Sequence, residues 1–218
     1  MKKICNMNEI KEKLVDLVYD YKYGVKTCGD KEFDRRIVNF GYKPTPYTKL
    51  HKIFQKYSFN KENNLIDYGC GKGRVLFVAA KNGCNKVTGI EIDKDMYAAT
   101  KSNIDRFQSK HKNVAASIEL VNQDAMKYEI DHSITDFFFY NPFHMKVFAH
   151  ILKKIEKSAI DFPRNIRIFL VHPDKSTLWL LEKMQHFILF EQSEKYRYVV
   201  YCTKEESEGS KAKYKINI

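Results

Sequence analysis

A glycine-rich turn between two short apolar runs, in residues 65–93, constrains the fold of this chain more than any other feature. The first run leads to the acidic residue Asp67, and the second, residues 86–92, contains Glu91. Between the runs lie three alternate glycines, followed by an apolar segment that contains alanine. The glycines are Gly69, Gly71 and Gly73. Short apolar runs bounded by glycine predict strands, so the segment predicts strand, tight turn, helix and strand, with a carboxylate at the end of each strand.

The two acids and the glycines indicate the chemistry of a ligand. Ligands of open α/β sheets bind beyond the carboxyl ends of the strands, so Asp67 and Glu91 are expected to face one crevice. A dinucleotide fingerprint would need a third glycine at the position of Arg74. A carboxylate beside the loop repels phosphate and attracts a cation, and Glu91 follows Gly73 by 18 residues, near the spacing of about 20 at which an acid binds ribose hydroxyls. The sequence therefore predicts a nucleoside with a positively charged group as the ligand.

The pattern resembles the first motif and the second-strand acid of class I S-adenosylmethionine-dependent methyltransferases. It reads Asp67-x-Gly69-x-Gly71-x-Gly73, with Glu91 at the end of the next strand. The resemblance implies S-adenosylmethionine as the cofactor, with Asp67 and the glycine loop at its methionine part and Glu91 at the ribose hydroxyls. A glycine turn that only packs a helix on a sheet is the alternative, but it does not need an acid on each side.

Three further residues are assigned to the adenine by the same resemblance. Ile92 is expected to lie against the adenine ring. A third strand, predicted at about residues 117–121, is followed by Asp124 and Ala125. In the family an acid at this place accepts a hydrogen bond from the adenine amine, and the next backbone N–H binds a ring nitrogen. A helix N-cap at Asp124 is the alternative, and the two roles are compatible.

The apolar strand predicted at residues 137–140 ends in the motif Asn141-Pro142-Phe143. At this strand end an asparagine amide oxygen and a backbone carbonyl can accept hydrogen bonds from a target amine, and an aromatic ring can stack on a planar acceptor. The motif resembles the longer (Asn/Asp)-Pro-Pro-(Tyr/Phe) motif of amine-directed methyltransferases. It has one proline only, so neither the ring geometry nor the substrate of the longer motif carries over. A plain Asn-Pro turn is the alternative.

Residues 1–60 predict a helical N-terminal arm, or lid, that precedes the sheet domain. Apolar residues recur at helical spacing between residues 10 and 21. In many class I methyltransferases the segment before the glycine loop folds over the cofactor and forms a wall of the acceptor pocket. By this analogy the candidate pocket residues are Tyr42, Thr45 and Tyr47. The combination of this Tyr-x-Pro-x-Pro-Tyr arm with the short Asn-Pro-Phe motif is also loosely similar to the non-SET lysine methyltransferases. An arm that only covers a sheet edge is the alternative.

The whole pattern predicts an α/β fold with a doubly wound, mostly parallel, seven-stranded sheet. Five strands alternate with helices, and two further runs at residues 187–191 and 196–202 predict a C-terminal antiparallel hairpin strand. The helical N-terminal arm completes the fold. The expected class I methyltransferase domain spans residues 61–204, and a polar C-terminal tail spans residues 205–218.

Composition adds expectations about partners and location. The net charge of +11, from 38 basic and 27 acidic residues, favours nucleic acid or another acidic macromolecule as a partner, although lysine-rich composition can also follow from genome bias. Five cysteines without C-x-x-C spacing argue for a reducing cytoplasm and against a zinc site, so we expect no metal. No apolar run approaches the roughly 18 residues of a membrane span, and the start lacks the apolar region of a signal peptide.

These features together predict an S-adenosylmethionine-dependent methyltransferase that moves a methyl group in line from the sulfonium to an acceptor. The acceptor is expected to be an amine nitrogen of a nucleic acid or a protein. The alternatives are a methyltransferase of a small molecule, a non-catalytic S-adenosylmethionine-binding module and an NAD-dependent Rossmann oxidoreductase; Arg74 and the early Asp67 argue against the last. His172 is a further candidate as a general base. The sequence leaves the acceptor and the oligomeric state open.

Overall fold

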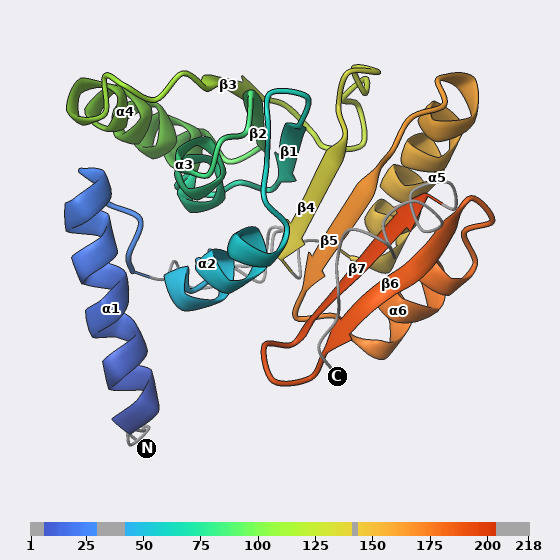
Figure 1. Cartoon of the computed structure of the whole chain (residues 1–218), viewed down its shortest axis with the longest axis horizontal. Coiled ribbons are helices and arrows are strands. Elements are labelled where there is room, and N and C mark those ends of the chain that lie inside the picture. The colour runs from blue at the N-terminus through green and yellow to red at the C-terminus, as the bar shows by residue number, and fades with distance from the viewer. Residues whose placement is uncertain (1–6, 30–41, 141–143, 204–218) are drawn as a thin grey trace.

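Apolar strands form the centre of a seven-stranded sheet with helices on both faces (Figure 1). The computed structural model describes residues 7–29, 42–140 and 144–203. The strands are β1 (Asn64–Tyr68), β2 (Lys86–Glu91), β3 (Ser117–Asn122), β4 (Asp136–Tyr140), β5 (Arg167–Val171), β6 (Phe187–Ser193) and β7 (Tyr198–Thr203). Their order is β3-β2-β1-β4-β5-β7-β6, and β7 alone runs antiparallel to its neighbours β5 and β6. The predicted α/β sheet with an antiparallel C-terminal hairpin is confirmed.

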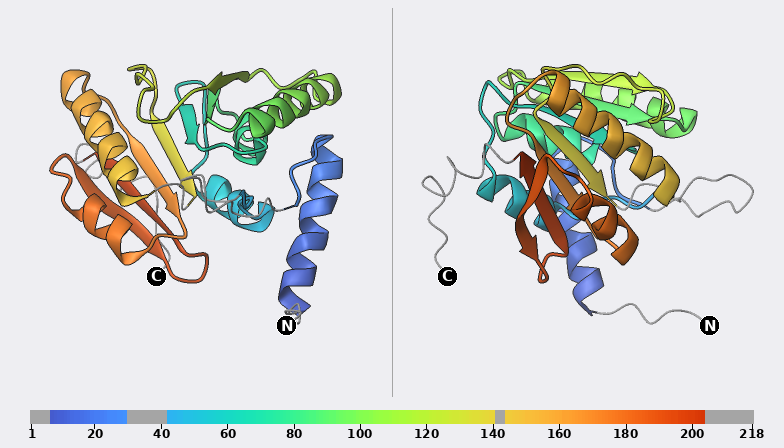
Figure 2. Two further views of the ribbon diagram at one scale, coloured as in Figure 1. Left: turned by 180° about the vertical axis from the view of Figure 1, so that it is seen from behind. Right: turned by 90° about the vertical axis from the view of Figure 1, so that its right-hand side faces the viewer.

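The helices divide between the two faces of the sheet because successive strand residues point in opposite directions. The helices are α1 (Met7–Tyr23), α2 (Tyr47–Lys56), α3 (Arg74–Lys81), α4 (Lys94–Lys110), α5 (Met145–Asp161) and α6 (Lys175–Glu182). Leu65 and Phe138 pack in one core with apolar side chains of α2, α3 and α4, whereas Ile66 and Phe139 pack in a second core with α5 and α6. Figure 2 shows α5 and α6 on the face opposite to α3. Within the described ranges, no helix is both long and apolar enough to cross a membrane.

The strand order reverses between β1 and β4. From β1 the chain proceeds outward to β2 and β3, then returns to β4 on the other side of β1 and continues to β5. Ligands of doubly wound sheets bind at such a reversal, and the parallel strands put the loop after β1 and the carboxyl end of β4 at the same end of the sheet.

Helix α1 has its apolar face on the outside. Its exposed apolar side chains are Met7, Ile10, Leu14, Leu17, Val18 and Tyr21. The opposite face buries two carboxylates, Asp16 and Asp20, against the rest of the chain. Helix α1 packs on α2, where the rings of Tyr19 and Tyr47 lie 5.2 Å apart. The apolar spacing therefore predicts the helix correctly, but the face that packs on the domain is the polar one.

The cause of this orientation is Arg74, the first residue of α3. Its guanidinium group is buried, with a side-chain exposure of 2%, and donates hydrogen bonds to four groups of the arm, one of which is the sulfur of Cys28. Its Nη1 lies 2.5 Å from Oδ2 of Asp16 and 3.0 Å from the carbonyl oxygen of Thr45, and its Nε lies 2.8 Å from Oγ1 of Thr27. The same group lies over the ring of Tyr47, at 4.3 Å from its centroid. A buried guanidinium needs a carboxylate and several acceptors. The polar face of α1 supplies the carboxylate of Asp16, and the segments after α1 and before α2 supply the acceptors of Thr27 and Thr45.

Asp20 fixes the loop that follows α1. Its carboxylate accepts hydrogen bonds from the backbone N–H groups of Thr27 and Cys28 and from the hydroxyl groups of Thr27 and Tyr47. Four donors satisfy a buried carboxylate well. The two acids thus hold α1 and the loop after it against α2 and against the start of α3.

We predict that Arg74→Met lowers the free energy of unfolding by about 3–5 kcal/mol, because the Asp16 carboxylate then stays buried without its cation. Urea unfolding followed by circular dichroism measures this loss. The control is Lys81→Met, a change of an exposed cation at the other end of the same helix, which should change stability by no more than about 0.5 kcal/mol. A loss in Arg74→Met no larger than that of the control would contradict the role of Arg74.

Candidate active site

The structure brings Asp67 and Glu91 to the same face of the sheet at the carboxyl ends of β1 and β2. Asp67 is level with Gly89 in the parallel register, and Gly89 and Glu91 lie two residues apart on one strand, so their side chains point to the same side. Both carboxyl groups are buried, with exposures of 3% for Asp67 and 8% for Glu91. The backbone therefore places the two acids on the same side of the sheet, as the sequence analysis expects.

Asp67 is a buried carboxyl group at the carboxyl end of β1. None of the described residues donates a hydrogen bond to it. Burial, and then the negative charge of Glu91, hold the pKa of Asp67 well above its ordinary range. A buried carboxylate is costly unless a cation or a hydrogen-bond donor accompanies it. The surroundings of Asp67 therefore fit a ligand that brings a positively charged, hydrogen-bonding group, such as the α-amino group of S-adenosylmethionine.

Glu91 ties the glycine loop to the end of β2. Its Oε2 accepts the backbone N–H of Gly71 at 2.9 Å, and its Oε1 accepts the backbone N–H of Asp93 at 2.8 Å. Burial raises the pKa of Glu91, and these two hydrogen bonds act in the opposite direction. Each carboxylate oxygen has a second lone pair, so Glu91 can still accept hydrogen bonds from a pair of hydroxyl groups. This fits the expected contact with a ribose.

The glycine loop adopts a backbone that other residues rarely adopt. Gly69, Gly71 and Gly73 all have positive φ, from 54° to 85°. A Cβ at Gly71 would lie 2.3 Å from the ring of Tyr42, so the arm passes directly over the loop. The hydroxyl of Tyr42 donates to the carbonyl oxygen of Thr27 at 2.7 Å, which holds the ring in place. Glycine is required at position 71 both by the backbone conformation and by the close approach of Tyr42.

The three candidate pocket residues of the arm have different surroundings. Tyr42 is partly exposed and touches the glycine loop. Thr45 and Tyr47 are buried in the contact between the arm and α3, where the backbone N–H of Tyr47 donates to Asp16. This placement gives Thr45 and Tyr47 a packing role, and a role of the three residues in an acceptor pocket stays a prediction.

The residues assigned to the adenine lie at the carboxyl ends of β2 and β3. Ile92 is exposed, at 51%, although it is apolar. Asp124 is half-buried and its Oδ1 accepts the backbone N–H of Met126 at 2.9 Å, while Ala125 is buried. Asp124 begins a turn and not a helix, so the alternative of a helix N-cap is wrong. An exposed apolar side chain next to buried acids is a surface against which a flat base can pack.

The acceptor motif Asn141-Pro142-Phe143 lies outside the described residues. Its neighbour Tyr140 ends β4 and pairs with Val171 of β5. His172, the candidate general base, accepts a hydrogen bond at Nε2 from Lys49 Nζ if the lysine is charged, at 2.6 Å. Burial and nearby cations lower the pKa of His172 to about 4, so this imidazole is a weak base.

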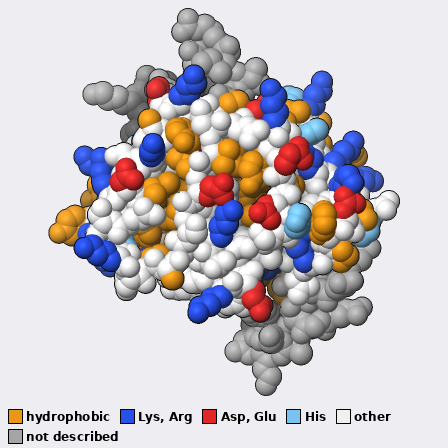
Figure 3. Space-filling model, turned by 90° about the horizontal axis from the view of Figure 1, so that it is seen from above, with side chains coloured by type: hydrophobic (Ala, Val, Ile, Leu, Met, Phe, Trp, Pro, Cys, Tyr) orange, Lys and Arg blue, Asp and Glu red, His pale blue; other side chains and the backbone are white. Residues whose placement is uncertain are grey.

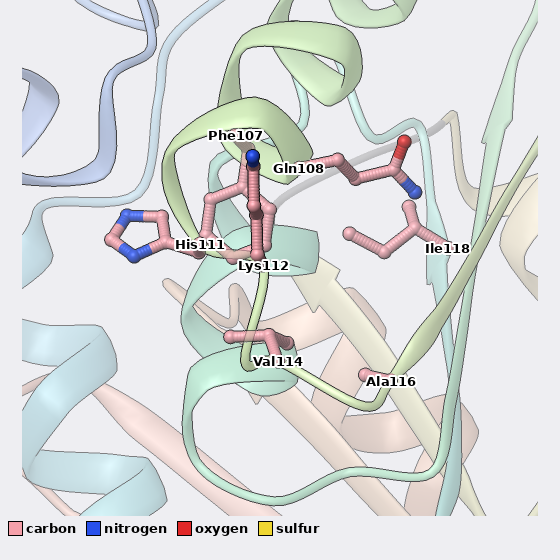
Figure 4. Close-up of a pocket in the computed structure, with 7 residues that line it drawn as sticks. All are labelled: Phe107, Gln108, His111, Lys112, Val114, Ala116 and Ile118. Atoms are coloured by element: carbon pink, nitrogen blue, oxygen red, sulfur yellow. The ribbon is translucent and has the colours of Figure 1, made fainter.

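A small cavity elsewhere in the molecule is separate from this site. It has a volume of about 140 Å³ and lies between the end of α4, at Phe107 and His111, and the start of β3, at Ile118 (Figure 4). The start of β3 is at the opposite end of the sheet from Asp67 and Glu91. Among the described residues, no group of three or more His, Cys, Asp or Glu side chains is arranged to hold a metal ion.

Comparison with known proteins agrees with this geometry. Residues 65–158 match a protein family described as a methyltransferase domain. The ribosomal protein L11 methyltransferases of Polynucleobacter necessarius and Paraburkholderia phymatum are 42% and 36% identical to this chain over 67 residues. These matches cover 30% and 31% of this chain and 20% and 22% of the two relatives. The chain thus matches only about a fifth of the length of these curated relatives.

A solved structure shows the same fold over most of the chain. The RNA methyltransferase of Salinibacter ruber, determined in complex with S-adenosyl-L-homocysteine, superimposes with a TM-score of 0.54 at 19% identity. The alignment covers 74% of this chain and 92% of that protein. The sheet with its flanking helices is therefore the Rossmann-like fold of the class I methyltransferases.

We predict that Asp67→Asn raises the melting temperature at neutral and alkaline pH. Because folding raises the pKa of Asp67, the stability linked to its bound proton is present at low pH and is lost as the pH rises through the folded-state pKa. Asparagine does not ionise and avoids this loss, and each kcal/mol recovered raises the melting temperature by about 2–4 °C in a chain of this size. Thermal unfolding of both proteins between acidic and alkaline pH measures the difference.

The control for this prediction is Asp105→Asn, which changes an exposed carboxylate on α4. It should give the same pH profile as the unmodified protein. If Asp67→Asn were less stable than the unmodified protein at alkaline pH, the account of Asp67 as a buried carboxyl group without a donor would be wrong.

Proposed function

We propose, from the match of residues 65–158 to a methyltransferase domain and from the fold of the sheet, that this protein transfers a methyl group from S-adenosylmethionine to an amine nitrogen of a macromolecule. The observation that carries the proposal is the pair of buried acids at one sheet edge. Asp67 has no donor among the described residues, and Glu91 keeps lone pairs for a diol. A site of this kind binds a ligand that is cationic at one end and carries vicinal hydroxyl groups beside it.

S-adenosylmethionine supplies a methyl group on a positively charged sulfur, which is already a good electrophile. The residues of the chain therefore mainly bind and orient. Asp67 and the backbone around Gly71 hold the methionine part, Glu91 holds the ribose hydroxyls, and Ile92 with Asp124 holds the adenine. Positioning of two reactants in line can lower a barrier by roughly 7–11 kcal/mol.

The acceptor end of the crevice begins where β4 ends, at Tyr140. Asn141, Pro142 and Phe143 come next in the sequence and are the proposed acceptor residues. An asparagine amide oxygen and a backbone carbonyl can hold an amine by its N–H groups and keep its lone pair directed at the methyl group. Because a proline has no N–H, no backbone donor at position 142 competes for the amine.

A macromolecular acceptor is favoured over a small molecule by two observations. The similar proteins are named for a ribosomal protein in one case and for RNA in the other. The net charge of +11 favours an acidic partner. Transfer of radiolabelled methyl groups to a cell extract, followed by digestion with nuclease or protease, tests this part of the proposal. A label that stays in the small-molecule fraction would contradict a macromolecular acceptor, and no label at all would favour a non-catalytic binding module.

We predict that Asp67→Ala and Glu91→Ala weaken S-adenosylmethionine binding by about ten- to a hundredfold each, because each removes hydrogen bonds to charged groups worth about 1.5–3 kcal/mol. Isothermal titration calorimetry measures the affinity. Asp105→Ala removes one exposed carboxylate from α4 and is the control, with unchanged affinity. Unchanged binding in both site variants would refute the assigned cofactor site, and binding of NADH by the unmodified protein would favour the oxidoreductase alternative.

We predict that Asn141→Ala abolishes methyl transfer and leaves cofactor affinity within about twofold, since the amide contacts the acceptor and not the nucleoside. Transfer to the labelled acceptor fraction and calorimetric titration with S-adenosylmethionine measure the two effects. An equal loss of transfer and of cofactor affinity would show that Asn141 has no separate role at the acceptor.

A further inference from the structure

Four basic side chains lie near one another at the carboxyl ends of β4 and β5. We call them the basic cluster, and they are Lys43, Lys49, His172 and Arg197. They come from the segment before α2, from α2 itself, from the residue after β5 and from the turn between β6 and β7. Figure 1 shows the ends of β4 and β5 converging beside α2.

The centre of the basic cluster is held by direct contacts. Nζ of Lys49 lies 2.6 Å from Nε2 of His172, and the ring of His172 lies 5.3 Å from that of Tyr140, at 68° to it. The backbone N–H of His172 donates to the carbonyl oxygen of Arg197 at 2.7 Å. Lys49, His172 and Tyr140 are half-buried, whereas Lys43 and Arg197 are exposed. The half-buried residues of the cluster are thus held by contacts with one another, and its two outer cations are exposed to solvent.

Two members of the basic cluster have an unusual backbone. His172 has φ 56° and Arg197 has φ 53°, and within the described ranges they are the two residues other than glycine with positive φ. Side chains in this region cost free energy and are enriched at functional sites. His172 directly follows β5 and Arg197 is in the turn between β6 and β7, so the two unusual conformations lie side by side.

Positive charges surround His172 in the basic cluster. After burial, the charges of Lys49, Arg197 and Lys43 lower the pKa of His172 to about 4. Burial, Arg197 and Lys43 also lower the pKa of Lys49, and Glu12 of α1 acts in the opposite direction. His172 is therefore neutral at physiological pH. A charged Lys49 can only donate, so with this partner Nε2 of His172 accepts. The hydrogen of the neutral ring is then on Nδ1, which can donate to a ligand.

The geometry points to a phosphate-binding site at the basic cluster, which holds a backbone phosphate of a nucleic-acid acceptor beside the acceptor end of the crevice. This inference rests on the proposed function and names its substrate class. Lysine, arginine and a neutral imidazole N–H are all donors to phosphate oxygens, and a half-buried tyrosine ring beside them is a surface on which a base can stack.

The position of the cluster favours an acceptor over unspecific attraction. Tyr140 lies against His172 and directly precedes Asn141 in the sequence, so the basic cluster is next to the residue that leads into the proposed acceptor motif. Elsewhere the charges are mixed: on the face shown in Figure 3, Lys and Arg side chains alternate with Asp and Glu around exposed apolar side chains. The surface is thus not uniformly positive, because this face carries both positive and negative side chains.

The test compares the double variant Lys43→Ala, Arg197→Asn with the unmodified protein. Asparagine tolerates positive φ better than most residues and keeps the turn. Fluorescence anisotropy with short single-stranded RNA and DNA of one sequence, over a series of salt concentrations, measures the affinity. We expect binding about tenfold weaker or more, and a slope of log affinity against log salt that falls by roughly 1.4, about 0.7 for each lost phosphate contact.

The matched control is Lys61→Ala, Lys101→Ala, which removes the same charge from two exposed positions away from the cluster. It should leave affinity and slope within about twofold and about 0.3 of the unmodified protein, because distant screened charges contribute little. An equal loss in the control would overturn the site in favour of general attraction. Competition by polyglutamate as strong as that by the oligonucleotide would overturn phosphate recognition in favour of an acidic polypeptide.

A second readout tests the site without nucleic acid or activity. In an NMR titration of the histidine ring protons, inorganic phosphate should raise the pKa of His172 from about 4, because a bound anion stabilises the imidazolium. An unchanged pKa at saturating phosphate would contradict the site. Cofactor titration separates the two proposals: if the unmodified protein did not bind S-adenosylmethionine, the proposed function would fail while the phosphate measurements would still decide on the basic cluster.

Discussion

The buried guanidinium of Arg74 is the interaction on which the arrangement of this molecule depends. It sits at the first position of the helix that follows the glycine loop, and it reaches across to a carboxylate of α1 and a carbonyl oxygen of the segment before α2. Taking an arginine and an aspartate out of water is favourable only when nearly all their hydrogen bonds are made. The polar face of α1 is therefore turned inward, its apolar side chains face outward, and Tyr42 is carried over Gly71.

The same loop holds a second constraint, of the opposite kind. Arg74 has its partners in the folded chain, whereas Asp67 does not find one among the described residues. A buried charged group whose hydrogen bonds are made within the chain stabilises the fold. A buried charged group whose partner is a ligand destabilises the fold until the ligand binds. The two lie seven residues apart on either side of the glycines, so the segment that anchors the arm also contains the residue that is left for the cofactor. Binding sites commonly combine these two properties, because some stability is given up where a ligand must be recognised.

Much of the fold followed from local patterns, and the unpredicted parts are those that depend on distant contacts. The strands were predicted because each is a short apolar run ended by glycine, proline or an acid, and Asp67 and Glu91 were predicted because strand ends in such a sheet share an edge. Arg74 was seen only as a missing glycine, since nothing in its neighbourhood shows that its partner is Asp16, 58 residues away. For the same reason, the sequence did not predict which face of α1 packs on the domain. The basic cluster joins Lys49 to His172 across 123 residues, and no spacing rule connects them.

The anchoring of the arm by a residue of the loop has a consequence for the modular use of this fold. Segments ahead of a sheet domain are often regarded as exchangeable parts that can be transplanted between relatives. Here Arg74 belongs to the sheet domain and Asp16 belongs to the N-terminal arm. An exchange of the arm would therefore separate the two residues of one ion pair. In a chimaera, the transferred arm would pack correctly only if the new sheet domain also had an arginine at position 74.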